Sequence, residues 1–382
     1  MRILTRRDFL KSGAIAASAI TAGLQPLPVL FAAHTKSDAL ASVSSINLHK
    51  TGEKSSWLRV KGKQIVTEND KPFLLAGIGY CRDVIISAQD DAVMQFCISH
   101  HLNMVRLAFY TQLFNNEPGH PINIDDHIKN FINPVVTAAK KAGIYVILDD
   151  HEYFHQIIDE KDARGVQKSK IWDDATVTNW IACWTKVASA YRDEPTVMGY
   201  ELQNEPNGME PGMVRDFYTR CLKAIRNVDQ RHIIIVGSDD WSHARSMAST
   251  WAPVASTIDK PYNNVVFSFH DYPGDNDPPV VRNYIVKFRD TYHVPVLCTE
   301  FGATWWQHSE AECRAFEIGM LELFSNENIG WSIWALTCLV DNPKNQCDVP
   351  DHHAMGPPPT YDSCAYSDIW PSFAQKMTDR NA

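Results

Sequence analysis

Residues 104–109 read Met-Val-Arg-Leu-Ala-Phe, and residues 145–148 read Tyr-Val-Ile-Leu. Both runs are short and nearly all apolar, which is typical of strands buried on both faces of a parallel sheet. A helical stretch at 124–142 lies between them, and Gly143 is placed to end that helix. A strand, a helix and a second strand make one βα unit, and this unit sets the pattern for the chain.

The same alternation continues toward both ends of the chain. Six further apolar runs are predicted strands, at residues 73–78, 197–202, 233–236, 265–269, 296–298 and 329–335. Helical periodicity falls between them, at residues 177–191, 213–228, 280–292 and 310–324. Ser309 and Glu312 form a capping box for the last of these helices. Eight strands that alternate with helices predict an α/β fold, a (β/α)8 TIM barrel.

An open, doubly wound sheet is the alternative fold. It requires a glycine-rich phosphate turn after the first strand, and Gly77-Ile78-Gly79-Tyr80 lacks the third glycine. Residues 57–65 alternate polar and apolar side chains, and we expect them to form a short N-terminal hairpin that closes the bottom of the barrel. We predict one (β/α)8 catalytic domain over residues 57–382.

The first residues are predicted to be an export signal. The twin arginine Arg6-Arg7 precedes a weakly apolar, Ala-rich run at 13–24, which is typical of a Tat-type signal peptide. We place the signal at residues 1–41, with a flexible tether at 42–56. A retained anchor helix is the alternative, but the run is short for a membrane span. The expected location is therefore periplasmic or secreted, with no membrane attachment after cleavage.

Charge and cysteine content narrow the possible partners. The net charge of −9 leaves no excess of Lys and Arg to neutralise phosphates, so we expect no nucleic-acid partner. Four of the 9 cysteines lie in apolar periodic stretches and are predicted buried thiols: Cys97, Cys183, Cys221 and Cys298. In an oxidising compartment we expect a disulfide between two of Cys338, Cys347 and Cys364. We expect a monomer.

Polar residues occupy the predicted strand ends, where a barrel of this type carries its chemistry. Arg106 interrupts an apolar strand, and the later strands end in Asp149-Asp150-His151, Asn204-Glu205-Pro206, His270-Asp271-Tyr272 and Glu300-Phe301-Gly302. Two carboxylates, Glu205 and Glu300, stand among these residues. Hydrolysis of a glycosidic bond needs such a pair on either side of the bond.

The sequence resembles glycoside hydrolase family 5, the cellulase-type group, over roughly residues 57 to 375. The matching stretches fall in the family's order: residues 103–107, 147–151, 202–206, 269–272, 299–302 and 331–334. Asn204-Glu205-Pro206 and Thr299-Glu300-Phe301-Gly302 are specific as a pair. The first strand departs from the pattern, because Gly79-Tyr80 stands where many members have an Asn.

The resemblance implies a role for each matching residue. Glu205 is implied to be the acid/base and Glu300 the nucleophile of a retaining enzyme, which needs no metal or cofactor. Arg106 and Tyr272 would orient Glu300, and Asn204 would bind the sugar 2-hydroxyl. The sugar would also be lined by His151 and His270 and stacked by Trp334.

Aromatic residues near the strand ends predict an extended groove for a polysaccharide or oligosaccharide. Trp offers the largest stacking face for a pyranose ring. The candidates are Trp241 and Trp305, followed by Tyr80, Tyr110, Trp172 and Trp306. This spread favours endo-action on a β-linked glucan, with cellulose-type β-1,4-glucan as first choice and mannan, mixed-linkage or β-1,3-glucan as alternatives.

Three other interpretations remain open from the residues. His151-Glu152-Tyr153-Phe154-His155 matches the HExxH signature of zinc peptidases, but that motif works on a helix and here follows a strand. A barrel that binds carbohydrate without catalysis is a second alternative. The acidic loop 271–277 could hold Ca²⁺, although a solvated turn fits its spacing better.

Overall fold

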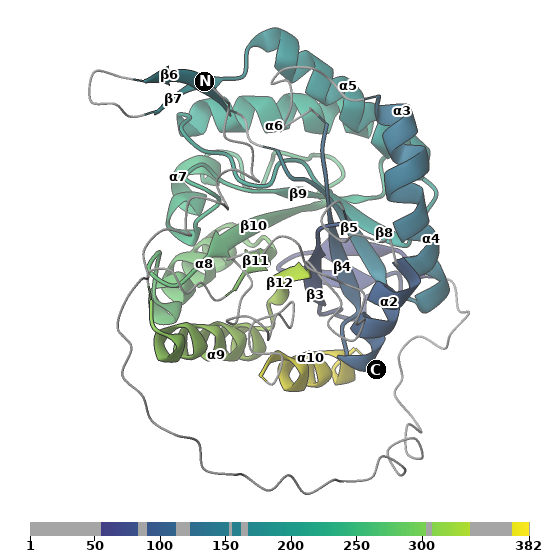
Figure 1. The fold of residues 1–382 in the computed structure, drawn as a ribbon, viewed down its shortest axis with the longest axis vertical. Coiled ribbons are helices and arrows are strands. Elements are labelled where there is room, and N and C mark those ends of the chain that lie inside the picture. The colour runs from purple at the N-terminus through teal and green to yellow at the C-terminus, as the bar shows by residue number, and fades with distance from the viewer. Residues whose placement is uncertain are drawn as a thin grey trace, which may run out of the picture.

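The computed structural model describes residues 55–82, 90–111, 123–152, 155–161, 167–302, 308–336 and 369–381. Eight parallel strands close into a barrel in the order β3-β4-β5-β8-β9-β10-β11-β12, and helices surround it (Figure 1). The barrel closes where β12 pairs with β3. The predicted (β/α)8 barrel is therefore confirmed, and the open sheet is excluded.

The barrel strands are β3 (Ala76–Tyr80), β4 (Met104–Phe109), β5 (Tyr145–Asp150), β8 (Val197–Glu201), β9 (Ile233–Val236), β10 (Val265–Asp271), β11 (Val296–Phe301) and β12 (Gly330–Leu336). The prediction placed the first strand too early, at residues 73–78. Phe73 and Leu75 are apolar because they pack beneath the barrel, ahead of the strand. Two strands that were not predicted form an antiparallel pair, β6 (His155–Lys161) and β7 (Gln167–Ile171).

The helices are α2 (Asp90–Ser99), α3 (Ile124–His127), η1 (Ile128–Ile132), α4 (Asn133–Ala142), α5 (Asp174–Tyr191), α6 (Pro211–Arg226), η2 (Ala244–Ser246), α7 (Met247–Trp251), α8 (Pro278–Tyr292), α9 (Glu310–Glu327) and α10 (Trp370–Asp379). Gly143 ends α4 with φ 72°, and the capping box of Ser309 and Glu312 is present on α9. Within the described part of the chain, no helix combines the length and apolarity that a membrane span requires.

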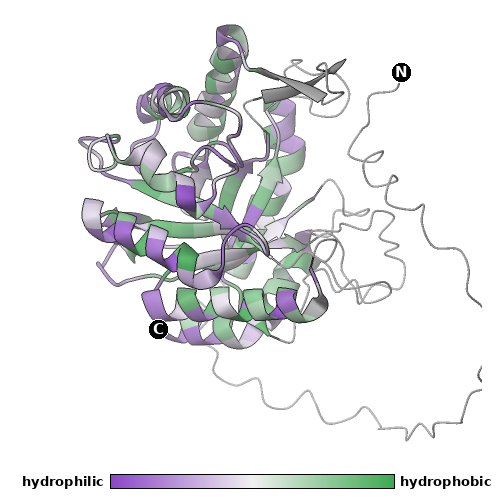
Figure 2. Cartoon of the chain, turned by 90° about the vertical axis from the view of Figure 1, so that its left-hand side faces the viewer, coloured by the Kyte–Doolittle hydropathy of each residue, from purple (hydrophilic) through white to green (hydrophobic). Residues whose placement is uncertain are grey.

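Two apolar layers hold the barrel. The larger layer lies between the strands and the helices. The helices that contribute to it alternate hydrophobic and hydrophilic residues along their length (Figure 2). The larger layer includes the four predicted thiols, Cys97, Cys183, Cys221 and Cys298, all of them buried as expected. The three cysteines considered for a disulfide, at 338, 347 and 364, lie outside the described residues.

The second layer fills the N-terminal end of the barrel. It consists of Leu58, Ile65, Phe73, Leu75, Met104, Tyr145, Ile147, Met198, Ile233, Ile235, Val266 and Leu297. Leu58 and Ile65 come from the antiparallel hairpin of β1 (Leu58–Lys61) and β2 (Gln64–Thr67). The predicted N-terminal hairpin is therefore confirmed, and it closes this end of the barrel. The opposite end, where the strands finish, is left for polar side chains.

Candidate active site

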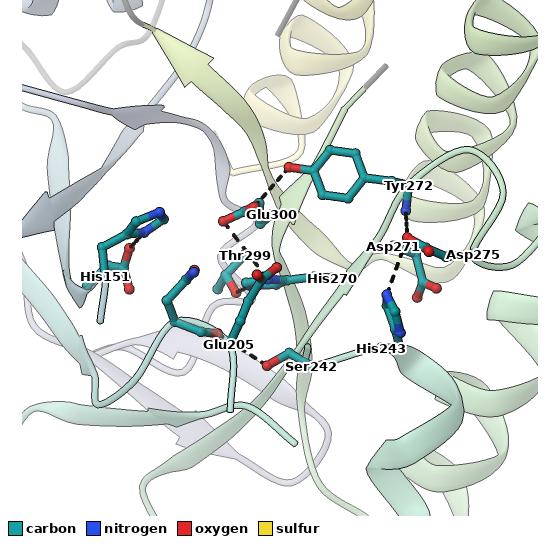
Figure 3. A network of polar contacts seen from close by, with 12 residues as sticks. His151, Glu205, Ser242, His243, His270, Asp271, Tyr272, Asp275, Thr299 and Glu300 are labelled. Atoms are coloured by element: carbon teal, nitrogen blue, oxygen red, sulfur yellow. Dashed lines mark hydrogen bonds and ion pairs between the residues drawn. The ribbon is translucent and has the colours of Figure 1, made fainter. Parts of the chain in front are cut away.

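Polar side chains that lie at or after the strand ends meet in one network at the mouth of the barrel (Figure 3). His151 follows β5, Glu205 lies in the loop after β8, His270 is in β10 and Glu300 is in β11. The C-terminal ends of parallel strands share one rim of the barrel. Residues far apart in the sequence therefore become neighbours there.

Arg106 lies at the centre of this network, and its side chain is fully buried in β4. Its Nε donates to Glu201 Oε2 at 2.6 Å, and its Nη1 donates to Glu300 Oε2 at 2.8 Å. Its Nη2 donates to Asn204 Oδ1 at 2.6 Å and lies 3.1 Å from Asp149 Oδ2. One permanent cation is thus shared by three buried carboxylates.

Glu205 and Glu300 approach each other across the mouth. One carboxylate oxygen of each, together with a ring nitrogen of His270, lie within 4.8 Å of one another. Retaining glycosidases hold their two carboxyl groups about 5–5.5 Å apart, whereas inverting enzymes need about 6.5–9.5 Å to admit a water. The observed separation matches the retaining class.

The two carboxyl groups have different surroundings. Glu300 accepts hydrogen bonds from Arg106 and from the Tyr272 hydroxyl at 2.9 Å. Burial alone would raise the pKa of Glu300, but the positive charges of His270 and Arg106 outweigh burial and hold that pKa below its usual range. Burial and the negative charge of Glu300 raise the pKa of Glu205. One group is therefore suited to be an ionised nucleophile and the other a proton donor.

A hydrogen-bonded chain behind His270 was not predicted from the sequence. His270 Nδ1 lies 2.9 Å from Glu205 Oε1, and its Nε2 lies 3.0 Å from Thr299 Oγ1. The Thr299 hydroxyl donates to Glu201 Oε1 at 2.6 Å. Burial lowers the pKa of His270, but the surrounding carboxylates, Glu300 first, raise it to about 10. The sequence signal for Glu201 was an acidic residue inside an apolar strand, the counterpart of Arg106.

His151 and Trp334 form a stacked pair beside this network. Their ring centroids are 4.5 Å apart with an interplanar angle of 4°, and His151 Nδ1 lies 2.7 Å from Asp149 Oδ2. The Arg106 guanidinium lies 5.6 Å from the Trp334 ring centroid. A Cβ at Gly79 would lie 2.6 Å from Trp334 Cε3, so only glycine permits this close approach. The departure at Gly79 therefore makes room for the tryptophan.

The structure sorts the predicted groove aromatics into different groups. Trp241 is 43% exposed in the loop after β9, and Tyr110 is half-buried beside His151. Trp305 and Trp306 lie outside the described residues. Two predictions were wrong. Tyr80 is fully buried and donates its hydroxyl to Asp90 at 2.7 Å, and Trp172 is buried against Trp180.

Two motifs, the HExxH sequence at 151–155 and the acidic loop at 271–277, are the ones that the sequence offered for metal binding. His151 and Glu152 lie in the loop after β5, and His155 begins β6, so this HExxH sequence is not on a helix. In the acidic loop, Asp271 accepts from Asn276 and from the Ala244 N–H. Across the described ranges, the one group placed to hold a metal ion is Glu205, His270 and Glu300, and hydrogen bonds within the network already engage all three.

Comparisons with known proteins place this chain in a family. Residues 66–338 match Cellulase (glycosyl hydrolase family 5). An endoglucanase of Paenibacillus polymyxa is 26% identical over 73% of this chain and 79% of its own length. A β-xylosidase of Phanerodontia chrysosporium is 25% identical over 64% of this chain, and the chain spans only 55% of that relative.

The fold comparison agrees. The catalytic domain of a Thermobifida fusca endoglucanase in complex with cellotetraose superposes with a TM-score of 0.55 at 22% identity, over 74% of this chain and 85% of that one. The chain is therefore a glycoside hydrolase. It belongs to glycosyl hydrolase family 5, as the resemblance in the sequence indicated.

Proposed function

We propose that the protein is a retaining endo-β-1,4-glucanase that works by double displacement. The observation that carries this proposal is the approach of Glu205 and Glu300 to within 4.8 Å, with opposite shifts of their pKa values. Endoglucanase relatives support the cellulose-type substrate. The alternatives are β-mannanase and mixed-linkage or β-1,3-glucanase activity on the same site.

In the first step, ionised Glu300 attacks the anomeric carbon while Glu205 protonates the departing oxygen. The hydrogen bonds from Arg106 and Tyr272 hold the Glu300 carboxylate charged and oriented. A covalent glycosyl-enzyme forms and the leaving sugar chain departs with its new hydroxyl. We assign Asn204, fixed by Arg106 through its Oδ1, to bind the 2-hydroxyl of the reacting sugar.

In the second step, Glu205 removes a proton from water, and the hydroxide displaces Glu300 from the anomeric carbon. Esterification removes the negative charge that had raised the pKa of Glu205, so Glu205 stays ionised long enough to act as a base. His270 holds the Glu205 carboxyl in place through Nδ1 in both steps. The anomeric configuration is retained.

The substrate is tested by a panel of carboxymethylcellulose, lichenan, laminarin and mannan, scored by the release of reducing ends. We expect the highest turnover on carboxymethylcellulose, with a rapid fall in viscosity because cleavage is internal. Turnover of mannan with none of the β-glucans would replace the proposed substrate and keep the site. Release of single sugars without a fall in viscosity would indicate exo-action.

The catalytic assignment is tested with three single variants. Glu300→Gln and Glu205→Gln each lose about 100-fold or more of the rate, because each removes one partner of the acid and nucleophile pair. His155→Ala is the matched control for the HExxH motif and keeps full activity. Zinc bound in a one-to-one ratio together with activity lost in His155→Ala would support a peptidase instead.

We also propose that the protein is exported through the Tat pathway, on the strength of Arg6-Arg7 and the apolar run that follows. Replacement of both arginines by lysine removes the twin-arginine signature while keeping the charge. The expected result is retention of the activity in the cytoplasmic fraction. Unchanged export of this variant would reject the proposal.

A further inference from the structure

The loop after β9 presents an exposed tryptophan on an unusual backbone. Asp240, Trp241 and Ser242 have φ values of 61°, 54° and 60°. This left-handed region is unfavourable for residues that carry a Cβ, and three in succession are uncommon. Such a conformation persists only where its surroundings hold it. The contacts that hold the loop therefore indicate what it serves.

One set of contacts fastens this loop to the catalytic segment. The Trp241 N–H donates to the Pro206 carbonyl at 3.0 Å. The Ser242 hydroxyl donates to the Asn204 carbonyl at 3.2 Å. Asn204 and Pro206 flank Glu205 in the sequence. Trp241 is thus tied to the backbone on both sides of the acid/base, with 43% of its surface exposed.

A second set of contacts runs through His243, which is buried. Its Nε2 lies 3.3 Å from Asp275 Oδ2, whereas its Nδ1 is buried without a hydrogen-bond partner among the described residues and lies 3.7 Å from Asp240 Oδ2. Its ring centroid is 6.2 Å from that of Trp241. Asp275 in turn accepts from the N–H of Tyr272 at 3.0 Å (Figure 3). His243 therefore connects the loop that carries Trp241 to the loop that carries Tyr272, whose hydroxyl donates to Glu300.

The charges around His243 favour its protonated form. Asp240, Asp271 and Asp275 supply negative charge, and Arg245 is the nearby cation, itself bound to Asp240 at 2.7 Å. Burial alone would lower the pKa of His243, but the hydrogen bond to Asp275 and the charges of Asp275 and Asp271 outweigh burial and raise it. The imidazolium therefore persists to a higher pH than that of an ordinary histidine, and it is lost as the pH rises through this raised pKa.

We propose that His243 is a positioning residue for substrate binding. Its imidazolium pairs with Asp275 through Nε2 and lies close to Asp240 on its other side, and it thereby holds Trp241 in place as a stacking face for sugar rings bound next to Glu205. This role rests on the proposed hydrolase function and adds a residue that touches no reacting atom. It acts on the binding of the substrate and leaves the chemical step unchanged.

A double-mutant cycle with cellopentaose tests the link between the two residues. Trp241→Ala is expected to raise KM by about 3- to 10-fold, the effect of one lost aromatic stacking contact. His243→Gln is expected to raise KM in the same range with kcat within about twofold, and the double variant should match Trp241→Ala alone. His100→Gln, near the N-terminal end of β4, is the control and leaves KM unchanged. Independent effects that multiply, or a loss confined to kcat, would overturn the proposal.

The pH dependence of KM, measured for the unmodified enzyme and for His243→Gln, tests the charge of His243. In the unmodified enzyme KM should rise toward alkaline pH, and in His243→Gln it should stay high and flat. A KM of the unmodified enzyme that is flat over this range, or the same slope in both proteins, would overturn the role. Failure of the hydrolase proposal has a different signature, because the unmodified enzyme would then not cleave cellopentaose at all.

Discussion

Two buried arginines lie at opposite ends of the barrel. Arg226 binds the single carboxylate of Asp259 through Nε and Nη2, both at 2.8 Å, and donates to the carbonyl of His232, which precedes β9. Arg106, at the end where the strands finish, faces three carboxylates. Arg226 thus balances one carboxylate, whereas Arg106 and the protonated His270 share a cluster of several carboxyl groups. Burial and the negative charge of Glu300 raise the pKa of Glu205, which is what an acid catalyst needs.

The largest expected effect separates the two arginines. Arg106→Gln and Arg226→Gln should each lower the free energy of unfolding by about 3–5 kcal/mol, because each leaves a buried carboxylate unpaired. Only Arg106→Gln should also lower kcat, by about 100- to 1000-fold, since it removes a donor aimed at the nucleophile. Denaturant unfolding measures the change in stability, and kinetics on the folded protein measure the change in kcat. Equal kinetic losses would contradict the division between the ends.

A second substitution sharpens the comparison within one strand. Leu297 is fully buried in the apolar layer and lies three residues before Glu300 in β11. Leu297→Ala should cost about 2–5 kcal/mol of stability through the cavity it leaves. kcat/KM at a temperature where the protein is folded should stay the same. A catalytic loss of tenfold or more would mean that the apolar end also sets the geometry of the mouth.

Loss of the hydrogen bonds that join His270, Thr299 and Glu201 should have a smaller effect on stability. Thr299→Val keeps the shape of the side chain but removes the hydroxyl that joins His270 to Glu201. We expect the free energy of unfolding to fall by about 1–3 kcal/mol, because the substitution leaves buried polar groups unpaired. Thr299→Ser, which keeps the hydroxyl, should recover most of this loss. Equal stability of the valine and serine variants would show that the hydrogen bonds contribute little.

The smallest expected effect is a shift in the pH dependence of kcat/KM when Tyr272 is replaced. Activity needs Glu300 ionised and Glu205 protonated, so kcat/KM should rise through the lowered pKa of Glu300 and fall through the raised pKa of Glu205. Tyr272→Phe removes a hydrogen bond that favours ionised Glu300. The acidic limb should therefore move up by about one pH unit or less, while the alkaline limb stays. A shift of the alkaline limb alone would reverse the assignment of the two carboxyl groups.

Much of the site could be predicted because parallel strands must end on one rim. That rule brought Arg106, Glu205 and Glu300 together from three separate motifs. The sequence could not separate groove aromatics from core aromatics, because both kinds occur beside apolar strands. Tyr80 can be buried because Asp90, ten residues later, accepts a hydrogen bond from its hydroxyl. Glu201 was missed because it lies inside the apolar run of β8, one residue before the matching stretch 202–206, although its place in that run was the same signal that singled out Arg106.

The central claim is that Glu300 forms a covalent bond to the sugar while Glu205 lies within reach to serve as acid and base. Brief reaction with a 2-deoxy-2-fluoro cellobioside that carries a good leaving group would trap this intermediate, and peptide mass spectrometry would locate it. We predict one sugar per chain, attached to the peptide that contains Glu300, in the unmodified enzyme and not in Glu300→Gln. Attachment to Glu205, or the α-anomer as first product of cellopentaose cleavage, would contradict the account.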